Sequence, residues 1–167
     1  MKHLKYCPQC GNETLVFEND RKFSCNSCEF VLYHNCAPAV AVIVKCGNEI
    51  LFTRRNQNPA KGKLDLAGGF VDPKETAESA CARELFEELN ITIDKTKLIL
   101  IKTLPNVYHY KNINYNTLDL FYEYEVNEKF SVDLELSEVS EIVWIDANNI
   151  PIEKIAFESQ KMFFEEY

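Results

Sequence analysis

The segment Arg83-Glu84-Leu85-Phe86-Glu87-Glu88 gathers three glutamates and one arginine. On an α-helix, which turns by about 100° per residue, Glu84 and Glu88 lie about 40° apart, and Glu87 lies about 60° from Glu84. Acidic helix faces are commonly solvated, and each like-charge pair costs only about 0.2–0.5 kcal/mol at a surface. Spacing alone therefore leaves open whether these carboxylates face water or a functional cleft.

The small apolar residues of the same helix indicate which side faces inward. With Ala77 taken as zero, Cys81 falls at about 40° and Leu85 at about 80°. Glu84 and Glu88 fall at about −20° and 20°, within the same sector. Inward carboxylates need a cation or strong donors, and Mg²⁺ takes oxygen ligands and bridges carboxylates to phosphates. The direction of these side chains therefore predicts a magnesium site.

Two Cys-x-x-Cys pairs near the start of the chain form a second candidate metal site. Each pair places two thiolates on one side of a tight turn, and two such turns supply the four sulfurs of a closed, structural Zn²⁺ site. A redox pair and unligated thiols are the alternatives. His34 and Cys36 follow closely, and we expect packed residues rather than spare ligands there. The predicted zinc ligands are Cys7, Cys10, Cys25 and Cys28.

A glycine-rich turn, Leu66-Ala67-Gly68-Gly69-Phe70, precedes the acidic helix. A turn without side chains lets a substrate approach the backbone and exposes amide donors to a phosphate. A Gly-Gly pair alone is weak support, but its place ahead of the helix makes Gly68 and Gly69 candidate substrate-binding residues.

Composition bounds the fold that must position these groups. With 167 residues, of which 46% are hydrophobic and 12% aromatic, the chain can form a packed core. The net charge of −8 makes nucleic acid an unlikely partner, because sequence-independent binding depends on clustered Lys and Arg. No apolar run is long enough to span a membrane, and Met1–Cys7 lacks the apolar segment of a secretion signal, so we expect a cytoplasmic protein.

The composition changes near Pro38, where aliphatic strands begin, and we predict a domain over 1–36 and a second over 37–167. Turn signals at Asn19-Asp20 and Cys46-Gly47-Asn48 each predict a hairpin. A helix should begin near Thr76 and end near Leu89. The remaining expected strands are Phe30–His34, Leu64–Leu66, Lys97–Leu104, Asn116–Glu125 and Ile142–Ile145, and a closing helix is expected over Glu158–Glu166. Strands outnumber helices, which indicates a mixed sheet with helices packed on it.

From Gly69 to Ile91 the chain resembles the Nudix box, Gly-x5-Glu-x7-Arg-Glu-U-x-Glu-Glu-x-Gly-U, where U is aliphatic. Asn90 stands where the family has Gly, and Asn is the next most tolerant residue for the left-handed turn that ends a helix. The cysteine-rich segment, residues 7–34, resembles a zinc ribbon. The matching positions of the box are Gly69, Glu75, Arg83, Glu84, Leu85, Glu87, Glu88 and Ile91.

The Nudix resemblance covers about residues 38–167 and implies an α+β fold: an α/β/α sandwich with a mixed sheet, preceded by the zinc-ribbon β module. It implies that Glu84, Glu87 and Glu88 hold Mg²⁺ or Mn²⁺, and that Arg83 and Glu75 pair to orient that cluster. The implied reaction is attack by metal-activated water on the diphosphate linkage of a nucleoside diphosphate derivative.

The implied substrate is less specific than the implied reaction. Nudix hydrolases with a zinc ribbon are similar to NADH pyrophosphatases, which carry Ser-Gln-Pro-Trp-Pro-Phe-Pro after the box. The corresponding stretch here, Thr103–His109, keeps Pro105 and an aromatic at Tyr108 but lacks the Trp. ADP-ribose, NAD(H) and similar compounds therefore all stay open. Tyr108 either stacks on a base or ribose from a loop or packs at the sheet rim.

Charged residues outside the box supply further candidates. Arg54 and Arg55 could reach phosphates, although alternate strand residues point to opposite faces and one of the two should form a surface ion pair. Glu141 is a candidate substrate-site residue, and either Glu88 or Glu141 could take the proton of the attacking water.

Two other functions compete with a working hydrolase. A Nudix-like module could sense a nucleotide without cleaving it, but sensors can lose the acidic cluster that is intact here. RNA-end processing is the second, and the acidity of the chain weighs against it. A homodimer is expected by analogy only.

Overall fold

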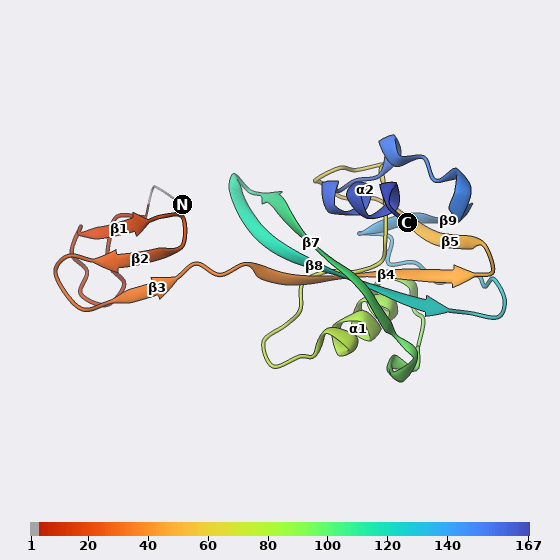
Figure 1. The fold of residues 1–167 in the computed structure, drawn as a ribbon, viewed down its shortest axis with the longest axis horizontal. Helices are drawn as coiled ribbons and strands as arrows, with labels where there is room; N and C mark the ends of the chain where they lie inside the picture. Colours follow the sequence, from red (N-terminus) through yellow and green to blue (C-terminus); the bar gives the residue numbers. More distant parts are fainter. Residues whose placement is uncertain (1–3) are drawn as a thin grey trace. The chain divides into compact units, whose positions relative to one another are not determined.

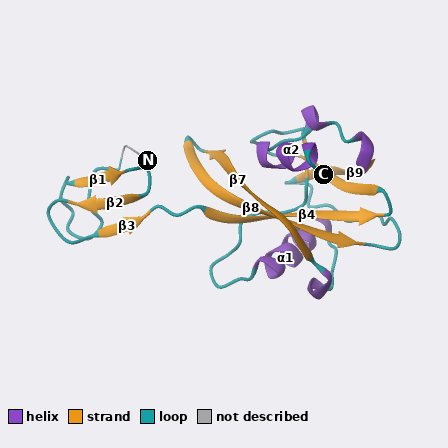
Figure 2. Cartoon of the chain, in the orientation of Figure 1, coloured by secondary structure: helices purple, strands orange, loops and turns teal. Residues whose placement is uncertain are grey.

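The computed structural model describes residues 4–167, so residues 1–3 of the predicted first domain lie outside the described residues. Contacts divide the chain into two compact units. The first runs to Cys36 and is grouped with Lys111–Ile113, and the second comprises Ala37–Tyr110 and Asn114–Tyr167. Figures 1 and 2 show the elements of each unit.

The first unit is a three-stranded antiparallel sheet, β1 (Leu15–Glu18), β2 (Lys22–Cys25) and β3 (Val31–Tyr33), in the order β1-β2-β3. The predicted hairpin is present, and Asn19 and Asp20 both have positive φ, 51° and 53°. The predicted two-residue turn was wrong, because Glu18 pairs with Lys22 and the loop therefore also includes Arg21. Figure 2 shows the three short strands joined by loops.

The second unit is built on a six-stranded mixed sheet. Five strands follow the order β6-β5-β4-β8-β7, and β9 pairs with β5. β4 runs parallel to β8, whereas its hairpin with β5 is antiparallel. The strands are β4 (Ala37–Cys46), β5 (Glu49–Arg55), β6 (Leu64–Asp65), β7 (Ile99–Tyr110), β8 (Ile113–Glu125) and β9 (Val139–Asp146).

Helix α1 (Ala77–Leu89) and helix α2 (Glu158–Glu165) cover opposite faces of this sheet (Figure 1). Alternate residues of β4 supply the two cores: Val40 and Val42 pack with the α1 cluster, while Ala41 and Ile43 pack with the α2 cluster. The predicted α/β/α sandwich with a mixed sheet is therefore correct. Short 3₁₀ turns occur at Lys95–Lys97, Ala147–Asn149 and Ile152–Lys154.

The ends of α1 confirm the predicted helix. Thr76 is the N-cap, and its side chain accepts a hydrogen bond from the Ser79 backbone N–H at 3.2 Å. Asn90 adopts the left-handed conformation, φ 54° and ψ 36°, and its backbone N–H bonds back to the carbonyl of Phe86. The Asn in the glycine position of the box therefore still closes the helix.

β7 and β8 differ most from expectation. We predicted strands over Lys97–Leu104 and Asn116–Glu125, but the observed strands extend to Tyr110 and begin at Ile113. The turn between them uses Lys111 and Asn112 at positive φ, 46° and 63°. The sequence prediction of a loop around Tyr108 was therefore wrong, because polar and aromatic residues continue the strand alternation there. No helix among residues 4–167 is both long and apolar enough to cross a bilayer.

Candidate functional site

The four paired cysteines converge at the first unit, where their sulfur atoms all lie within 4.8 Å of one another. Cys7 Sγ lies 3.7 Å from Cys28 Sγ, and Cys10 Sγ lies 3.7 Å from Cys25 Sγ. A tetrahedron of Zn–S bonds of about 2.3 Å places its sulfurs about 3.8 Å apart, so the spacing fits a four-sulfur zinc site.

Polar neighbours favour a thiolate at Cys25, whereas the pKa values of Cys10 and Cys28 are raised. Thr14 Oγ1 lies 3.2 Å from Cys25 Sγ, and the Ser27 backbone N–H donates to the same sulfur at 3.3 Å. The Thr14 hydrogen bond is the largest cause that lowers the pKa of Cys25 to about 6. His34 packs edge-on to Phe17 with ring centroids 5.9 Å apart, as we predicted. Cys36 is exposed, so the packing predicted for it was wrong.

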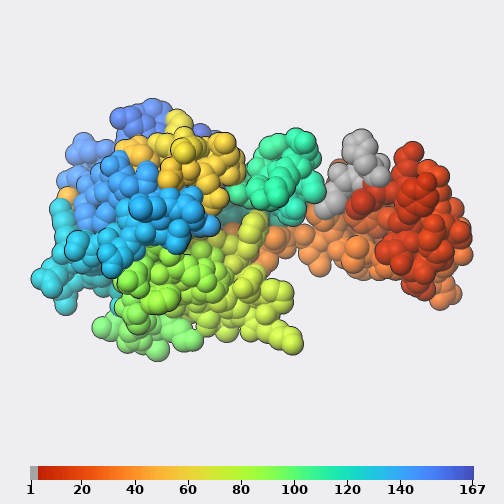
Figure 3. Space-filling model, turned by 180° about the vertical axis from the view of Figure 1, so that it is seen from behind, coloured from red at the N-terminus to blue at the C-terminus, as the bar shows by residue number. Residues whose placement is uncertain are grey.

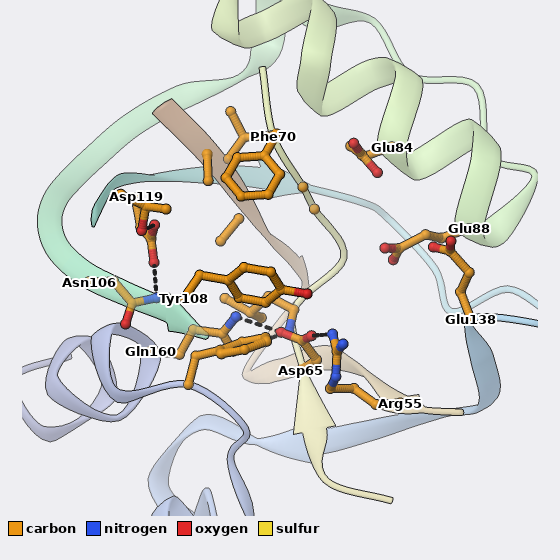
Figure 4. A pocket seen from close by; sticks show the side chains of 18 of the residues that line it. Arg55, Asp65, Phe70, Glu84, Glu88, Asn106, Tyr108, Asp119, Glu138 and Gln160 are labelled. Atoms are coloured by element: carbon orange, nitrogen blue, oxygen red, sulfur yellow. Dashed lines mark hydrogen bonds and ion pairs between the residues drawn. The ribbon is translucent and has the colours of Figure 1, made fainter. Parts of the chain in front are cut away.

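The second unit contains a pocket of about 390 Å³ between the acidic side of α1 and the sheet (Figure 4). Glu84, Glu87 and Glu88 line it, together with Gly68 and Gly69. The phase of α1 thus turns the carboxylates of Glu84 and Glu88 into a cavity, as the angular positions of the apolar residues predicted. The lining also includes Ala39, Ala41, Arg55, Asp65, Phe70, Arg83, Asn106, Tyr108, Thr117, Asp119, Glu138, Phe157 and Gln160.

Arg83 joins three glutamates. Its guanidinium donates to Glu75 through Nε and Nη2 at 3.1 and 3.0 Å, and Nη1 donates to Glu84 at 2.7 Å and to Glu87 at 3.1 Å. Nη2 also donates to the Phe70 carbonyl at 2.9 Å, which attaches the arginine to the segment that follows the two glycines. The Arg83 hydrogen bonds lower the pKa of Glu75.

The two glycines face different neighbours. A Cβ on Gly69 would lie 2.5 Å from Glu84 Oε1, and a Cβ on Gly68 would lie 2.0 Å from the backbone oxygen of Val40. Gly69 therefore leaves the space that the Glu84 carboxylate occupies. Gly68 permits close approach to β4, where Val42 bridges to Ala67.

Glu88 is the least satisfied group in the pocket. Its Oε2 is buried and accepts no hydrogen bond from the residues that the structure describes. Burial is the largest cause that raises the pKa of Glu88 well above its usual value, and the charges of Asp65, Glu84 and Glu138 raise it further. Burial likewise raises the pKa of Glu84. An orphaned carboxylate oxygen among like charges fits a bound divalent cation.

Glu138 is a site residue that the sequence reasoning missed. It lines the pocket, and Figure 4 shows its side chain beside that of Glu88. The loop before it lies over α1: the Glu135 backbone N–H donates to the Glu88 carbonyl at 3.1 Å, and Phe130 packs against the α1 core. Figure 3 shows the blue atoms of this segment beside the green atoms of α1. Glu138 belongs to no sequence motif. It reaches the pocket because the loop before it passes over α1, which local sequence patterns do not show.

Arg55 and Asp65 form the floor of the pocket. Arg55 Nη1 donates to Asp65 Oδ2 at 2.6 Å, and its guanidinium lies over the Phe157 ring, 4.9 Å from the centroid. Gln160 Nε2 donates to the other oxygen of Asp65 at 2.6 Å. Burial raises the pKa of Asp65, and the arginine opposes that effect.

Arg54 and Glu141 do not line this pocket, contrary to our expectation for substrate-binding residues. They form an ion pair with each other, and Arg54 also donates to the Gly62 carbonyl at 2.9 Å. Alternation along β5 explains the difference, because Arg55 faces the pocket and Arg54 points to the other side. The structure thus places Glu138, rather than Glu141, near the α1 glutamates.

Aromatic rings line the pocket between its two sides. The ring centroids of Phe70 and Tyr108 lie 5.7 Å apart in an edge-to-face arrangement, and those of Tyr108 and Phe157 lie 5.8 Å apart. Tyr108 thus projects into the pocket from β7 rather than from a loop. Phe70, next to the glycine turn, is 42% exposed, so part of its side chain is accessible to a ligand.

The fold and the acidic helix together define a Nudix architecture, and comparison with known proteins agrees. The NUDIX domain profile matches residues 36–165, so the chain belongs to the NUDIX domain family. A crystal structure of a NUDIX hydrolase from Nitrosomonas europaea is similar over 98% of this chain and 92% of that one, with a TM-score of 0.67 and 26% identity.

Curated relatives are similar over part of their length. The NAD-capped RNA hydrolase NudC of Haemophilus influenzae strain PittGG is 35% identical over 95 residues, which are 56% of this chain and 36% of the relative. NudC of Yersinia enterocolitica is 32% identical over 101 residues, which are 60% of this chain and 38% of the relative. The NUDIX domain of Shewanella oneidensis NrtR, solved with ADP ribose, shares the fold with a TM-score of 0.62 at 17% identity.

Proposed function

We propose that this protein is a divalent-metal-dependent hydrolase that cleaves the diphosphate linkage of a nucleoside diphosphate derivative. The observation that carries the proposal is the orphaned, buried Oε2 of Glu88, which lies in a pocket with Glu84 and Glu138. A pocket that concentrates carboxylates repels a diphosphate unless a cation neutralises both. Hydrolysis of a phosphate anhydride is the chemistry that such an arrangement serves.

Glu84, Glu87 and Glu88 would hold Mg²⁺ or Mn²⁺ in this proposal. The bound metal would polarise the diphosphate and lower the pKa of a water. Arg83 aligns Glu84 and Glu87 through its hydrogen bonds, and Glu75 fixes Arg83 in turn. Glu138 replaces Glu141 as the second candidate, beside Glu88, for the group that accepts the proton of the attacking water, because it lines the pocket.

The opposite side of the pocket would receive the rest of the substrate. Arg55 is positioned to contact a phosphate, and the ring of Phe70 can stack on a base. ADP-ribose and NAD(H), the candidate substrates that the sequence analysis left open, are the first compounds to consider. The curated relatives are NAD-capped RNA hydrolases, so RNA with an NAD cap is a further candidate substrate. Two facts weigh against it: the match spans 36% of the length of the first relative, and the net charge of this chain is −8.

The first unit would hold one structural Zn²⁺ on Cys7, Cys10, Cys25 and Cys28, which fits the measured sulfur spacing. Its role in this proposal is to fold a segment with few buried apolar residues. We assign no catalytic step to it.

An activity panel tests the proposal. ADP-ribose, NADH, NAD, sugar nucleotides, dinucleoside polyphosphates, nucleoside triphosphates and NAD-capped RNA are incubated with the protein, with and without Mg²⁺ or Mn²⁺. We expect metal-dependent release of a nucleoside monophosphate from a diphosphate-linked substrate. Loss of that activity in Glu87→Gln and Glu88→Gln supports the metal assignment. Tight binding of one compound without cleavage of any would show a sensor instead.

A further inference from the structure

The side of the pocket opposite the α1 glutamates holds a buried acid that the family motif does not include. Asp119 is 9% exposed and lines the pocket. Figure 4 shows Asp119 and Asn106 across the pocket from Glu84 and Glu88, with the rings of Phe70 and Tyr108 in view between the two sides. Because Asp119 lies across the pocket from the α1 glutamates, we assign it no part in holding the same cation.

Three uncharged groups donate to Asp119. Thr117 Oγ1 donates to Oδ1 at 2.6 Å, while Ser159 Oγ and Asn106 Nδ2 donate to Oδ2 at 2.6 and 3.0 Å. A carboxylate has about four acceptor positions, so about one stays open. The hydroxyl hydrogens of Thr117 and Ser159 both point to Asp119, and of these two residues only Thr117 lines the pocket, where its oxygen can accept from a ligand. The side of the pocket formed by Asp119 and Thr117 therefore mainly accepts hydrogen bonds.

Small side chains on the neighbouring strand leave room on this side of the pocket. In the parallel pairing of β4 with β8, Ala39 is opposite Asp119, and Ala41 is opposite Phe121. Ala39 and Ala41 both line the pocket. Larger residues at these positions would fill the space that now reaches Asp119.

We propose that Asp119 is the specificity-determining acceptor of this pocket and selects substrates whose group beyond the diphosphate is uncharged and carries O–H or N–H donors. The proposal rests on the proposed function, because the diphosphate must lie at the α1 side. A phosphorylated end group would meet a buried anion and a row of acceptors, which disfavours it. A ribose with free hydroxyls and a base with an exocyclic amine both offer the required donors.

A purely structural role is the alternative. Ser159 belongs to the first turn of α2, so its bond to Asp119 also attaches that helix to β8. If Asp119 only attached α2 to the sheet, its replacement would lower the stability of the protein and change the affinity for every ligand by the same factor. A specificity residue would change the ratio of affinities between ligands that differ by one donor.

Calorimetric binding separates these roles without depending on turnover. The probes, each titrated in the presence of Mg²⁺, are the non-hydrolysable α,β-methylene analogue of ADP-ribose and two derivatives of it. One derivative has an N6,N6-dimethyl adenine, and the other has O-methylated hydroxyls on the terminal ribose. In the parent protein we expect one derivative to bind about ten- to hundredfold more weakly than the unmodified probe, as for a lost hydrogen bond to a charged group. The derivative affected identifies the base or the sugar as the source of the donor.

Asp119→Asn should reduce the ratio of dissociation constants between the affected derivative and the unmodified probe to within about threefold. The reason is that an amide presents a donor where the carboxylate presented an acceptor. Asp94→Asn is the matched control, since Asp94 also accepts from a threonine hydroxyl at 2.6 Å but lies outside the pocket lining. It should leave the ratio unchanged. Equal ratios in the parent and Asp119→Asn, or a parent that binds all three probes alike, would overturn the proposal.

Two further outcomes are distinguishable. If Asp119→Asn does not fold, Asn106→Ala replaces it: removing this donor opens a second acceptor position on Asp119, and the ratio should change by at least about threefold. An unchanged ratio would again overturn the proposal. Normal donor-dependent binding combined with no metal-dependent cleavage would contradict the hydrolase function and support donor selection by Asp119.

Discussion

Arg83 donates two parallel hydrogen bonds to Glu75, from Nε to Oε1 at 3.1 Å and from Nη2 to Oε2 at 3.0 Å. The two residues are separated by the first two turns of α1, so the fork fixes the helix to the loop in front of it. A planar guanidinium makes this contact and still reaches Glu84 and Glu87. Arginine at this position therefore organises the acidic cluster rather than neutralising it.

Arg83→Lys should separate charge from geometry. Lysine keeps the positive charge but cannot bond Glu75 through two nitrogens while also holding Glu84. We expect metal-dependent activity to fall about ten- to hundredfold, as when a residue that orients metal ligands is lost. Initial rates at several Mg²⁺ concentrations measure the effect. A rate equal to that of the parent at every concentration would show that charge alone suffices.

Gly69→Ala should displace one carboxylate and leave the fold intact. The new Cβ would lie 2.5 Å from Glu84 Oε1, and the end of a side chain can move away. We expect activity to fall about ten- to hundredfold with little change in the free energy of unfolding, because Glu84, a proposed metal ligand, would be misplaced.

Gly68→Ala is the contrasting variant. There the Cβ would lie 2.0 Å from the Val40 carbonyl oxygen, which belongs to a central strand and cannot move freely. We expect a loss of about 1–3 kcal/mol in the free energy of unfolding. Urea denaturation of both variants checks the contrast, and equal destabilisation would contradict it.

Glu88→Gln should stabilise the metal-free protein while removing its activity. The buried carboxylate has a raised pKa, so the folded state holds the proton between the unfolded pKa of about 4.3 and its own higher value. The stability of the metal-free parent therefore falls as pH rises through that window. The variant lacks this titration, and above the window we expect it to be about 1 kcal/mol more stable, or a few degrees in Tm.

Thermal unfolding from pH 5 to pH 8, with and without Mg²⁺, tests this prediction. Added Mg²⁺ should raise the Tm of the parent more than that of the variant, because a ligand that binds the folded state stabilises it. Glu87→Gln is a useful comparison, since Glu87 is an exposed residue with a 56% exposed side chain. Its Tm without metal should stay near that of the parent. If the difference in Tm between the Glu88→Gln variant and the parent did not move in favour of the variant as pH rises from 5 to 8, charge burial at Glu88 would be ruled out.

Local patterns in the sequence predicted much of this structure. The phase of α1 placed Glu84 and Glu88 inward, and the strand alternation at Arg54 and Arg55 predicted that one of them would form a surface ion pair. These features depend on neighbours within a turn or a strand, which the sequence shows directly.

The missed residues come together only through the tertiary fold. Glu138 reaches the pocket because a loop without regular structure crosses α1, and Asp119 meets Ser159 because α2 returns to the sheet forty residues later along the chain. Nothing in the residues around Asp119 indicates that an alanine lies beside it on β4. Such contacts depend on strand order, which periodicity does not determine.

Metal removal should unfold the first unit and spare the second. Within residues 4–36 the described core is small, with Phe23 and the cysteines Cys7 and Cys25 as its buried residues. Zinc contributes about 10–16 kcal/mol to the folding of comparable small domains, more than such a core provides. We expect about one zinc per chain by elemental analysis, and we expect a strong chelator to collapse the amide signals of residues 4–36 in an NMR spectrum.

Two cysteine variants decide whether that metal is held as the sulfur spacing indicates. Cys10→Ser should release the zinc, because Cys10 Sγ lies 3.7 Å from Cys25 Sγ in the cluster. Cys36→Ser is the control: Cys36 is exposed and lies outside the cluster, so its loss should leave the zinc content unchanged. Dispersed signals from residues 4–36 in the chelated parent would show instead that the first unit folds without metal. Zinc loss in both variants would mean that Cys36 also ligates the ion.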